Sequence, residues 1–197
     1  MDYKKNILSR LEDTGSNQPL FMPDLDLWYR WHTERGTLPS GFENSSLVEI
    51  ANQLNCPPWV VVIPWELQFQ EIEVTREETD KIRTIEYHTS AGILTEKWTL
   101  GADGDWWQSE YPVKKVEDLD AAEILVNAKT YVMQTDVSGF EPNNQKIIDV
   151  AKLPMSPYAD MLHTFLGFSE GYMLLLGAGK DRLTEMLTVL ETKRQKY

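Results

Sequence analysis

The fold class follows from the segment Lys146-Ile147-Ile148-Asp149-Val150-Ala151, whose run of apolar residues predicts a short buried strand. Pro154-Met155-Ser156-Pro157 comes next and predicts the start of a helix, because serine is a favoured N-cap and proline suits the first helical position. That helix is expected to end near Gly167, and further helices are expected over 170–176 and from Asp181 onward. A strand followed by helices is the order of a parallel α/β fold.

A second buried strand is predicted upstream, over Trp59-Val60-Val61-Val62-Ile63-Pro64, because β-branched residues dominate it and Pro64 marks its end. Between the two strands, the alternation of polar and apolar residues predicts a β-hairpin or meander that turns at Ser90-Ala91-Gly92. Ser46 and Glu49 have the spacing of a capping box, which predicts a helix start. The other expected elements are helices over 2–11, from 25 to near Gly36, from Ser46 to Asn55 and from 116 to about Tyr131.

Composition and charge restrict the class of function. The chain has 197 residues, of which 42% are apolar and 25% charged, and this is enough to bury one substantial core. Its net charge of −12 repels phosphate backbones and anionic lipid, so we expect neither nucleic-acid nor membrane binding. Cys56 is the single cysteine, and the N-terminus lacks an apolar signal segment. We therefore expect a cytoplasmic protein.

Common catalytic motifs are absent from the sequence. No Gly-x-Ser-x-Gly elbow is present, and His32, His88 and His163 do not have the close spacing of metal ligands. The segment Gly177-Ala178-Gly179-Lys180 lacks both the earlier glycine and the following Ser or Thr of a phosphate-binding loop. We interpret it as a helix break.

Tryptophan is the residue in excess, with seven in the chain, and several are clustered. One interpretation is core packing, because an indole buries a large apolar area. The other is an aromatic-lined pocket for a flat ligand, for which Trp28, Trp31 and Trp65 are the predicted substrate-binding residues. Next to them, Arg30 and His32 suit a carboxylate or a phenolate, although a solvated helix face explains them equally.

The predicted catalytic residues are Glu66 and His32. Glu66 follows the strand that ends at Pro64, and a carboxylate just beyond a barrel strand is a usual position for a catalytic acid or base. The alternative interpretation is a surface glutamate on a loop. No metal ligand is predicted within this sequence.

Several segments share motifs with one known superfamily. The hairpin Glu86-Tyr87-His88-Thr89-Ser90-Ala91-Gly92-Ile93-Leu94-Thr95 is similar to a T-P-x-G-x-L motif, and Trp106-Trp107 follows it. Next comes Tyr111-Pro112-Val113-Lys114-Lys115-Val116-Glu117-Asp118-Leu119, which is similar to a pI-K-x-x-E-D entry to a helix. In this order, these segments resemble the uroporphyrinogen decarboxylase-like superfamily. The resemblance extends to Ser156–Leu162 with Leu166-Gly167-Phe168, and to the N-terminal segments Leu27-Trp28-Tyr29 and Arg35–Pro39, which are similar to the methyl-transfer and O-demethylation branch.

The resemblance implies a (β/α)₈ TIM barrel with an N-terminal helical extension and a β-hairpin. Members decarboxylate a porphyrinogen or move methyl groups between small substrates, corrinoid proteins and thiol or folate acceptors, often with zinc. The decarboxylase branch has an arginine motif, M-R-Q-A-G-R-Y, that Met22-Pro23-Asp24-Leu25-Asp26 does not match. Its F-S-D-I aspartate has at best Glu66 as a counterpart. These departures disfavour porphyrinogen decarboxylation, and the zinc ligands are expected in a further half of the fold.

We therefore expect one incomplete domain, with a helical extension over 1–58, a strand and hairpin over 59–113 and the start of the barrel over 114–197. The expected function is the N-terminal part of a methyltransferase that moves methyl groups between a small, methoxylated aromatic substrate and a corrinoid protein, completed by a second-half chain. The alternative is a non-catalytic binding or regulatory half-barrel subunit that completes its core as a homo-oligomer. A third hypothesis is a module that binds an aromatic compound.

Overall fold

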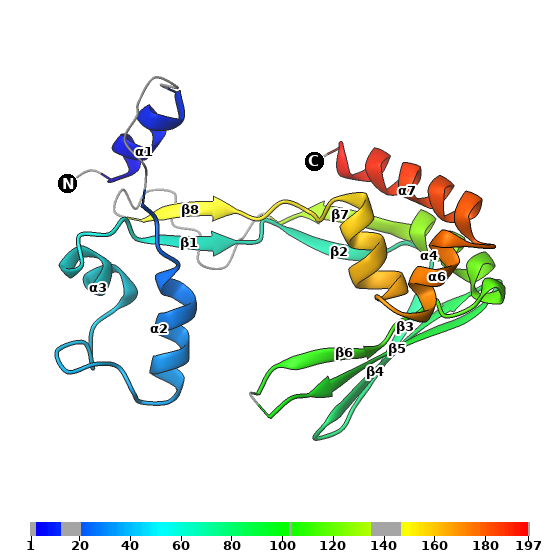
Figure 1. The fold of residues 1–197 in the computed structure, drawn as a ribbon, viewed down its shortest axis with the longest axis horizontal. Helices are drawn as coiled ribbons and strands as arrows, with labels where there is room; N and C mark the ends of the chain where they lie inside the picture. The colour runs from blue at the N-terminus through cyan, green and yellow to red at the C-terminus, as the bar shows by residue number, and fades with distance from the viewer. Residues whose placement is uncertain (1–2, 13–20, 103, 135–146, 197) are drawn as a thin grey trace. The chain divides into compact units, whose positions relative to one another are not determined.

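The computed structural model describes residues 3–12, 21–102, 104–134 and 147–196 (Figure 1). The chain divides into two compact units, which we describe separately. Unit 1 comprises Met1–Pro64 and Gln134–Leu153, and unit 2 comprises Trp65–Met133 and Pro154–Tyr197.

The described residues of unit 1 form three helices and a pair of parallel strands. The helices are α1 (Tyr3–Glu12), α2 (Leu25–Glu34) and α3 (Leu47–Gln53). Strand β1 (Trp59–Val62) pairs in parallel with β8 (Ile148–Ala151), so both strands predicted from the sequence form and lie side by side. The parallel pairing of β1 with β8 joins segments separated by more than eighty positions in the sequence.

Side-chain caps determine where the unit 1 helices begin. The predicted capping box of α3 is confirmed: the Ser46 hydroxyl accepts from the Glu49 amide at 3.3 Å, and the Glu49 carboxylate accepts from the Ser46 amide at 2.7 Å. This hydrogen bonding lowers the pKa of Glu49. Helix α2 begins in a similar way, because the Asp24 carboxylate accepts from the amide of Leu27 at 3.2 Å. Both caps satisfy amides that the first helical turn leaves without a partner.

Unit 2 is built on an antiparallel sheet in the order β3-β4-β5-β6. Its strands are β3 (Glu73–Glu78), β4 (Ile82–Thr89), β5 (Gly92–Leu100) and β6 (Trp106–Glu110). The predicted hairpin is confirmed as β4 and β5, which turn at Gly92 with a φ of +141°. A second, two-stranded antiparallel sheet pairs β2 (Trp65–Phe69) with β7 (Lys129–Met133).

The helices of unit 2 pack against one end of a single face of the four-stranded sheet (Figure 1). Its core joins Ile85, Tyr87 and Leu94 of the sheet to residues of several helices, with Leu119, Phe165 and Leu183 among them. The helical elements are η1 (Val116–Asp118), α4 (Leu119–Ala128), α5 (Pro157–Asp160), the π-helix η2 (Met161–Leu166), α6 (Glu170–Leu176) and α7 (Lys180–Arg194).

Three local expectations differ from the structure. The helix expected to reach Tyr131 ends at Ala128, because Lys129–Met133 forms β7 and hydrogen-bonds to β2. Strand β2 (Trp65–Phe69) was not predicted. It begins directly after Pro64, which was interpreted as the end of the preceding strand, and no turn residues separate the two strands. The helix expected from Pro157 has one α-helical turn and continues as a π-helix.

The chain mixes helices and strands, which confirms the α/β class in its coarse sense. Over the ranges that the structure describes, the strands form three separate sheets and no closed barrel. The expected single domain with divisions at residues 58 and 113 stays a prediction.

Candidate ligand-binding pocket

Unit 2 contains an open pocket with a volume of about 1200 Å³. Its floor is the part of the four-stranded sheet that the helices leave uncovered. The walls come from β2, from Tyr111 after β6 and from the π-helix η2 with Phe168 beyond it. The volume exceeds that of a drug-sized ligand site, about 300–1,000 Å³, so one such ligand fits with water around it.

Strand register explains which side chains form the floor. Arg76 lies opposite Ile85 on the neighbouring strand, and Ile85 lies opposite Glu96 on the next, so all three share one face of the sheet. A second row on the same face runs from Arg83 through Trp98 to Gln108. The alternation of β-strands thus places two arginines and a glutamate among apolar residues on the pocket side.

Glu96 is the buried polar centre of this floor, with 4% of its surface exposed. One carboxylate oxygen accepts from the hydroxyl of Tyr87 and from the indole N–H of Trp98, each at 3.2 Å. The other accepts from the amide of Gln108 at 3.0 Å. Burial raises the pKa of Glu96, and these donors together with Arg76 oppose that rise.

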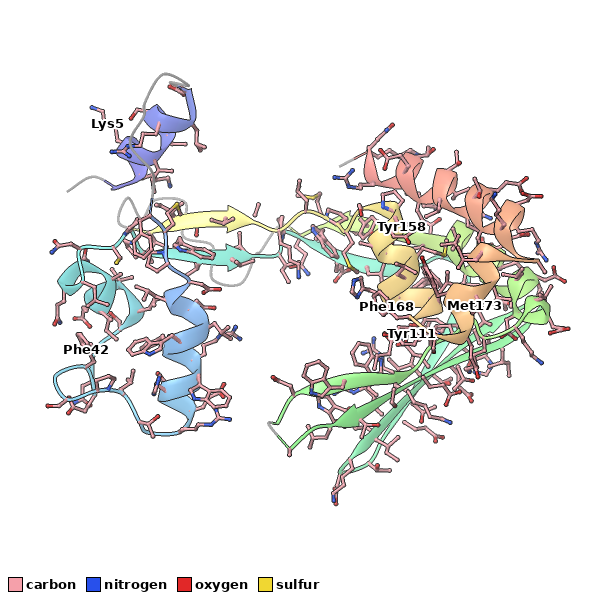
Figure 2. All side chains as sticks on the ribbon, in the orientation of Figure 1. Lys5, Phe42, Tyr111, Tyr158, Phe168 and Met173 are labelled. Atoms are coloured by element: carbon pink, nitrogen blue, oxygen red, sulfur yellow. The ribbon has the colours of Figure 1, made fainter. Side chains whose placement is uncertain are left out.

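Aromatic rings line much of the pocket. Trp98, Trp106, Tyr111 and Phe168 contribute such rings, and Phe168 is 60% exposed. The guanidinium of Arg83 lies 4.5 Å from the centre of the Trp106 ring, and its Nε donates to the Glu78 carboxylate at 2.7 Å. Figure 2 shows Tyr111 and Phe168 close together at the end of η2. Flat apolar rings with exposed faces suit a planar ligand.

The η2 wall is anchored at both ends. At its start, both oxygens of Asp160 accept from Nζ of Lys129 at 2.5 Å, and Asp160 also accepts from the hydroxyl of Thr164 at 2.8 Å. Burial lowers the pKa of Lys129, and the Asp160 carboxylate opposes this. At its end, Gly167 has a φ of +68° and lies so close to Tyr111 that a Cβ would overlap the ring. Thr164 and His163 therefore face the pocket from a fixed π-helical turn.

The sequence-predicted residues of α2 lie in unit 1. Nδ1 of His32 is 2.9 Å from the hydroxyl and 3.0 Å from the carbonyl of Thr37, and the ring of Trp28 is 5.0 Å away. The guanidinium of Arg35 lies 3.3 Å from the centre of the Trp31 ring, which is 48% exposed. These contacts order the end of α2 and the loop that follows it, and the predicted roles stay predictions.

The other two predicted residues, Trp65 and Glu66, lie on β2 of unit 2. Trp65 packs edge-on against Tyr131 with ring centres 5.1 Å apart. Glu66 is exposed on a strand, not on the loop of the alternative interpretation, and its carboxylate accepts from the amide of Gln68. None of Trp28, Trp31, His32, Trp65 and Glu66 lines the unit 2 pocket.

Sequence analysis missed Arg76, Arg83 and Glu96. A signal for Glu96 was present, because it alternates with Leu94 and Trp98 on a predicted strand and so occupies an inward position as a polar residue. The cluster of Trp98, Trp106 and Trp107 was visible as an excess of tryptophan, but its pairing with the two arginines depends on strand register.

The described part of the chain brings no three His, Cys, Asp or Glu side chains together in a way that fits a metal ion. Within the same ranges, every helix is too short or too polar to cross a membrane. Comparisons with models of protein families, with curated proteins and with solved structures found no match to this chain.

Proposed function

We propose that unit 2 binds a small planar aromatic compound in the pocket on its four-stranded sheet. The observation that carries this proposal is the set of aromatic side chains around one open pocket whose floor holds the buried carboxyl group of Glu96. Aromatic rings stack on or meet edge-to-face with other rings, and such pairs contribute about 0.5–1.5 kcal/mol each beyond the area they bury.

The hydrogen bonds of Glu96 support a preformed pocket. Trp98 of β5 and Gln108 of β6 each donate a hydrogen bond to this carboxyl group. The bond from Trp98 holds its indole in one orientation without a ligand. A ligand that stacks on an ordered ring loses less conformational entropy on binding than one that must order the ring first.

The resemblance to the uroporphyrinogen decarboxylase-like superfamily extends the proposal to a reaction class. On that basis, the chain is part of a TIM-barrel methyltransferase, its ligand is a methoxylated aromatic and a corrinoid protein is the methyl-transfer partner. The superfamily also implies zinc, but the described residues group no set of side chains that fits it, and no step here uses zinc.

The second candidate, a subunit that completes its core as an oligomer, is favoured by the two-stranded sheet of unit 1. Parallel strands are normally covered on both faces, whereas Val61 and Val150 of this pair are 50% and 38% exposed. Analytical ultracentrifugation over a dilution series tests this candidate. A self-associating species supports it, and a monomer at all concentrations contradicts it.

Two-dimensional NMR of the seven tryptophan indole N–H signals tests the binding proposal, with 4-methoxyphenol as a neutral aromatic probe and cyclohexanol as a non-aromatic control. We expect the probe to shift the signals of Trp98 and Trp106 and to leave those of Trp28 and Trp31 in place. Each signal is assigned by its loss in a Trp→Phe variant. Equal shifts with cyclohexanol, or no shift of the two pocket signals, would contradict the proposal.

A further inference from the structure

The charged groups of the unit 2 pocket indicate what kind of aromatic compound it binds. Arg76, Arg83, Glu96 and His163 are the titratable or cationic side chains that line it, besides Tyr87 and Tyr111, among the residues that the structure describes. Two arginines on one pocket floor carry a charge opposite in sign to the net charge of −12 of the whole chain. The two guanidinium groups oppose the general repulsion of anions here, although Arg83 already pairs with the Glu78 carboxylate.

Glu96 is poorly suited to bind a cationic ligand. It is the one carboxyl group among the described lining residues, and both of its oxygens already accept hydrogen bonds, three in total. A carboxylate has about four acceptor positions, so little capacity remains for a ligand ammonium group. Burial also favours its neutral form, which would not attract a cation.

The two arginines, in contrast, have donors to offer. Arg83 uses Nε for Glu78, and its two Nη groups make no hydrogen bond within the ranges that the structure describes. The Arg76 guanidinium makes no side-chain hydrogen bond with a described residue, and its charge acts on the nearby Glu96 and Tyr87. A guanidinium has five N–H donors whose planar arrangement matches the two oxygens of a carboxylate.

Strand register brings both guanidinium groups within reach of one anion. Arg76 lies opposite Ile85, and Arg83 is two positions before Ile85 on the same strand, so the two arginines are diagonal neighbours on one face. Diagonal neighbours have Cα atoms about 7–8 Å apart, a separation that two arginine side chains can bridge through a shared carboxylate. The Trp106 ring, over which Arg83 stacks, adjoins this point.

We infer that the pocket selects planar aromatic compounds that carry a carboxylate, and that Arg76 and Arg83 bind this carboxylate while the ring lies against the tryptophan wall. This inference rests on the proposed aromatic binding at the same site. It adds the charge of the ligand and the two residues that determine specificity.

Three probes with one ring and different charges test the inference: 4-methoxybenzoate, 4-methoxybenzamide and 4-methoxybenzylamine, titrated at neutral pH with the tryptophan indole signals as the readout. We expect the benzoate to bind about tenfold more tightly than the amide, and the amine more weakly than both. We expect Arg76→Gln and Arg83→Gln each to weaken benzoate binding severalfold and to leave amide binding unchanged. Arg30→Gln on α2 is the matched control and should change neither.

The outcomes separate the inference from the proposed function. If all three probes bind equally, or the amine binds most tightly, the inference is overturned while aromatic binding stands. If none shifts the pocket signals, both fail. Should an arginine variant not fold, the charge series on the unaltered chain still decides the preference. Loss of amide binding together with benzoate binding in both variants would also overturn the assigned role of the arginines.

Discussion

Lys129 and Asp160 form an ion pair at 2.5 Å whose side chains are 2% and 3% exposed. The pair joins the first residue of β7 to the residue before η2, and the hydroxyl of Tyr131 also donates to Asp160 at 3.2 Å. Taking two charges out of water is costly, so removing one partner leaves the other charge buried without compensation. The pair therefore makes the position of η2 sensitive to either residue.

We expect Lys129→Met and Asp160→Asn each to lower the free energy of unfolding by about 3–5 kcal/mol. The double variant Lys129→Met/Asp160→Asn should lose less than the sum of the two single changes, because no uncompensated charge remains. Urea denaturation measures all three. Lys97→Met is the control, since Lys97 pairs with Glu110 at a position where 45% and 32% of the side chains are exposed, and should cost at most about 1 kcal/mol. Single variants no worse than this control would contradict the expectation.

Gly167 and Gly36 both have positive φ, +68° and +61°, but a Cβ at Gly36 meets nothing within 4 Å, whereas one at Gly167 overlaps the Tyr111 ring. Gly167 also has a ψ of −166°, a backbone region essentially confined to glycine. We expect Gly36→Ala to cost about 1 kcal/mol from the backbone conformation and Gly167→Ala to cost clearly more, from backbone and overlap together. Thermal unfolding of the two variants gives the comparison. Equal losses would contradict the expectation.

The buried Glu96 makes stability depend on pH. Burial raises its pKa in the folded chain, so the folded state holds this proton more tightly than the unfolded state does. Its stabilising contribution is fully present below the ordinary glutamate pKa and is lost as the pH rises through the raised value. We expect Glu96→Gln to lack this loss, so that the variant gains stability relative to the unaltered chain as the pH rises.

The measurement is the difference in unfolding free energy between the two chains from about pH 4 to about pH 8. Replacement of the carboxyl by an amide also changes hydrogen bonding with Gln108, but this adds an offset that does not vary with pH. Glu117→Gln, on the exposed first turn of η1, is the control substitution. A flat difference for Glu96→Gln would indicate that burial does not perturb this group.

Phe168 tests the contribution of the pocket wall to binding without a large effect on folding, because 60% of its surface is exposed. We expect Phe168→Ala to weaken binding of an aromatic probe by about five- to tenfold, in keeping with the loss of one ring contact. Trp31→Ala on α2, with 48% exposure, is a matched change outside the pocket. Calorimetric titration compares the variants, and an equal loss in both would locate binding elsewhere.

Local signals predicted much of the secondary structure. The Ser46 capping box, the helix start at Ser156-Pro157 and the hairpin around Gly92 form as expected, because each depends on interactions within a few residues. The end of α4 was wrong because β7 is stabilised by hydrogen bonds to β2, some sixty positions earlier in the sequence. No local pattern encodes that pairing.

The candidate site shows the same division more strongly. The excess of tryptophan predicts an aromatic pocket, and the predicted residues are Trp28, Trp31 and Trp65, whereas Trp98 and Trp106 line the pocket that forms in unit 2. By itself the sequence determined the helix caps, the hairpin turn, the alternation of polar and apolar residues along the strands and the number of aromatic residues. Only the tertiary structure decided which of them meet, because strand register and helix packing join residues far apart in the chain, and burial then gives Glu96 and Lys129 their chemistry.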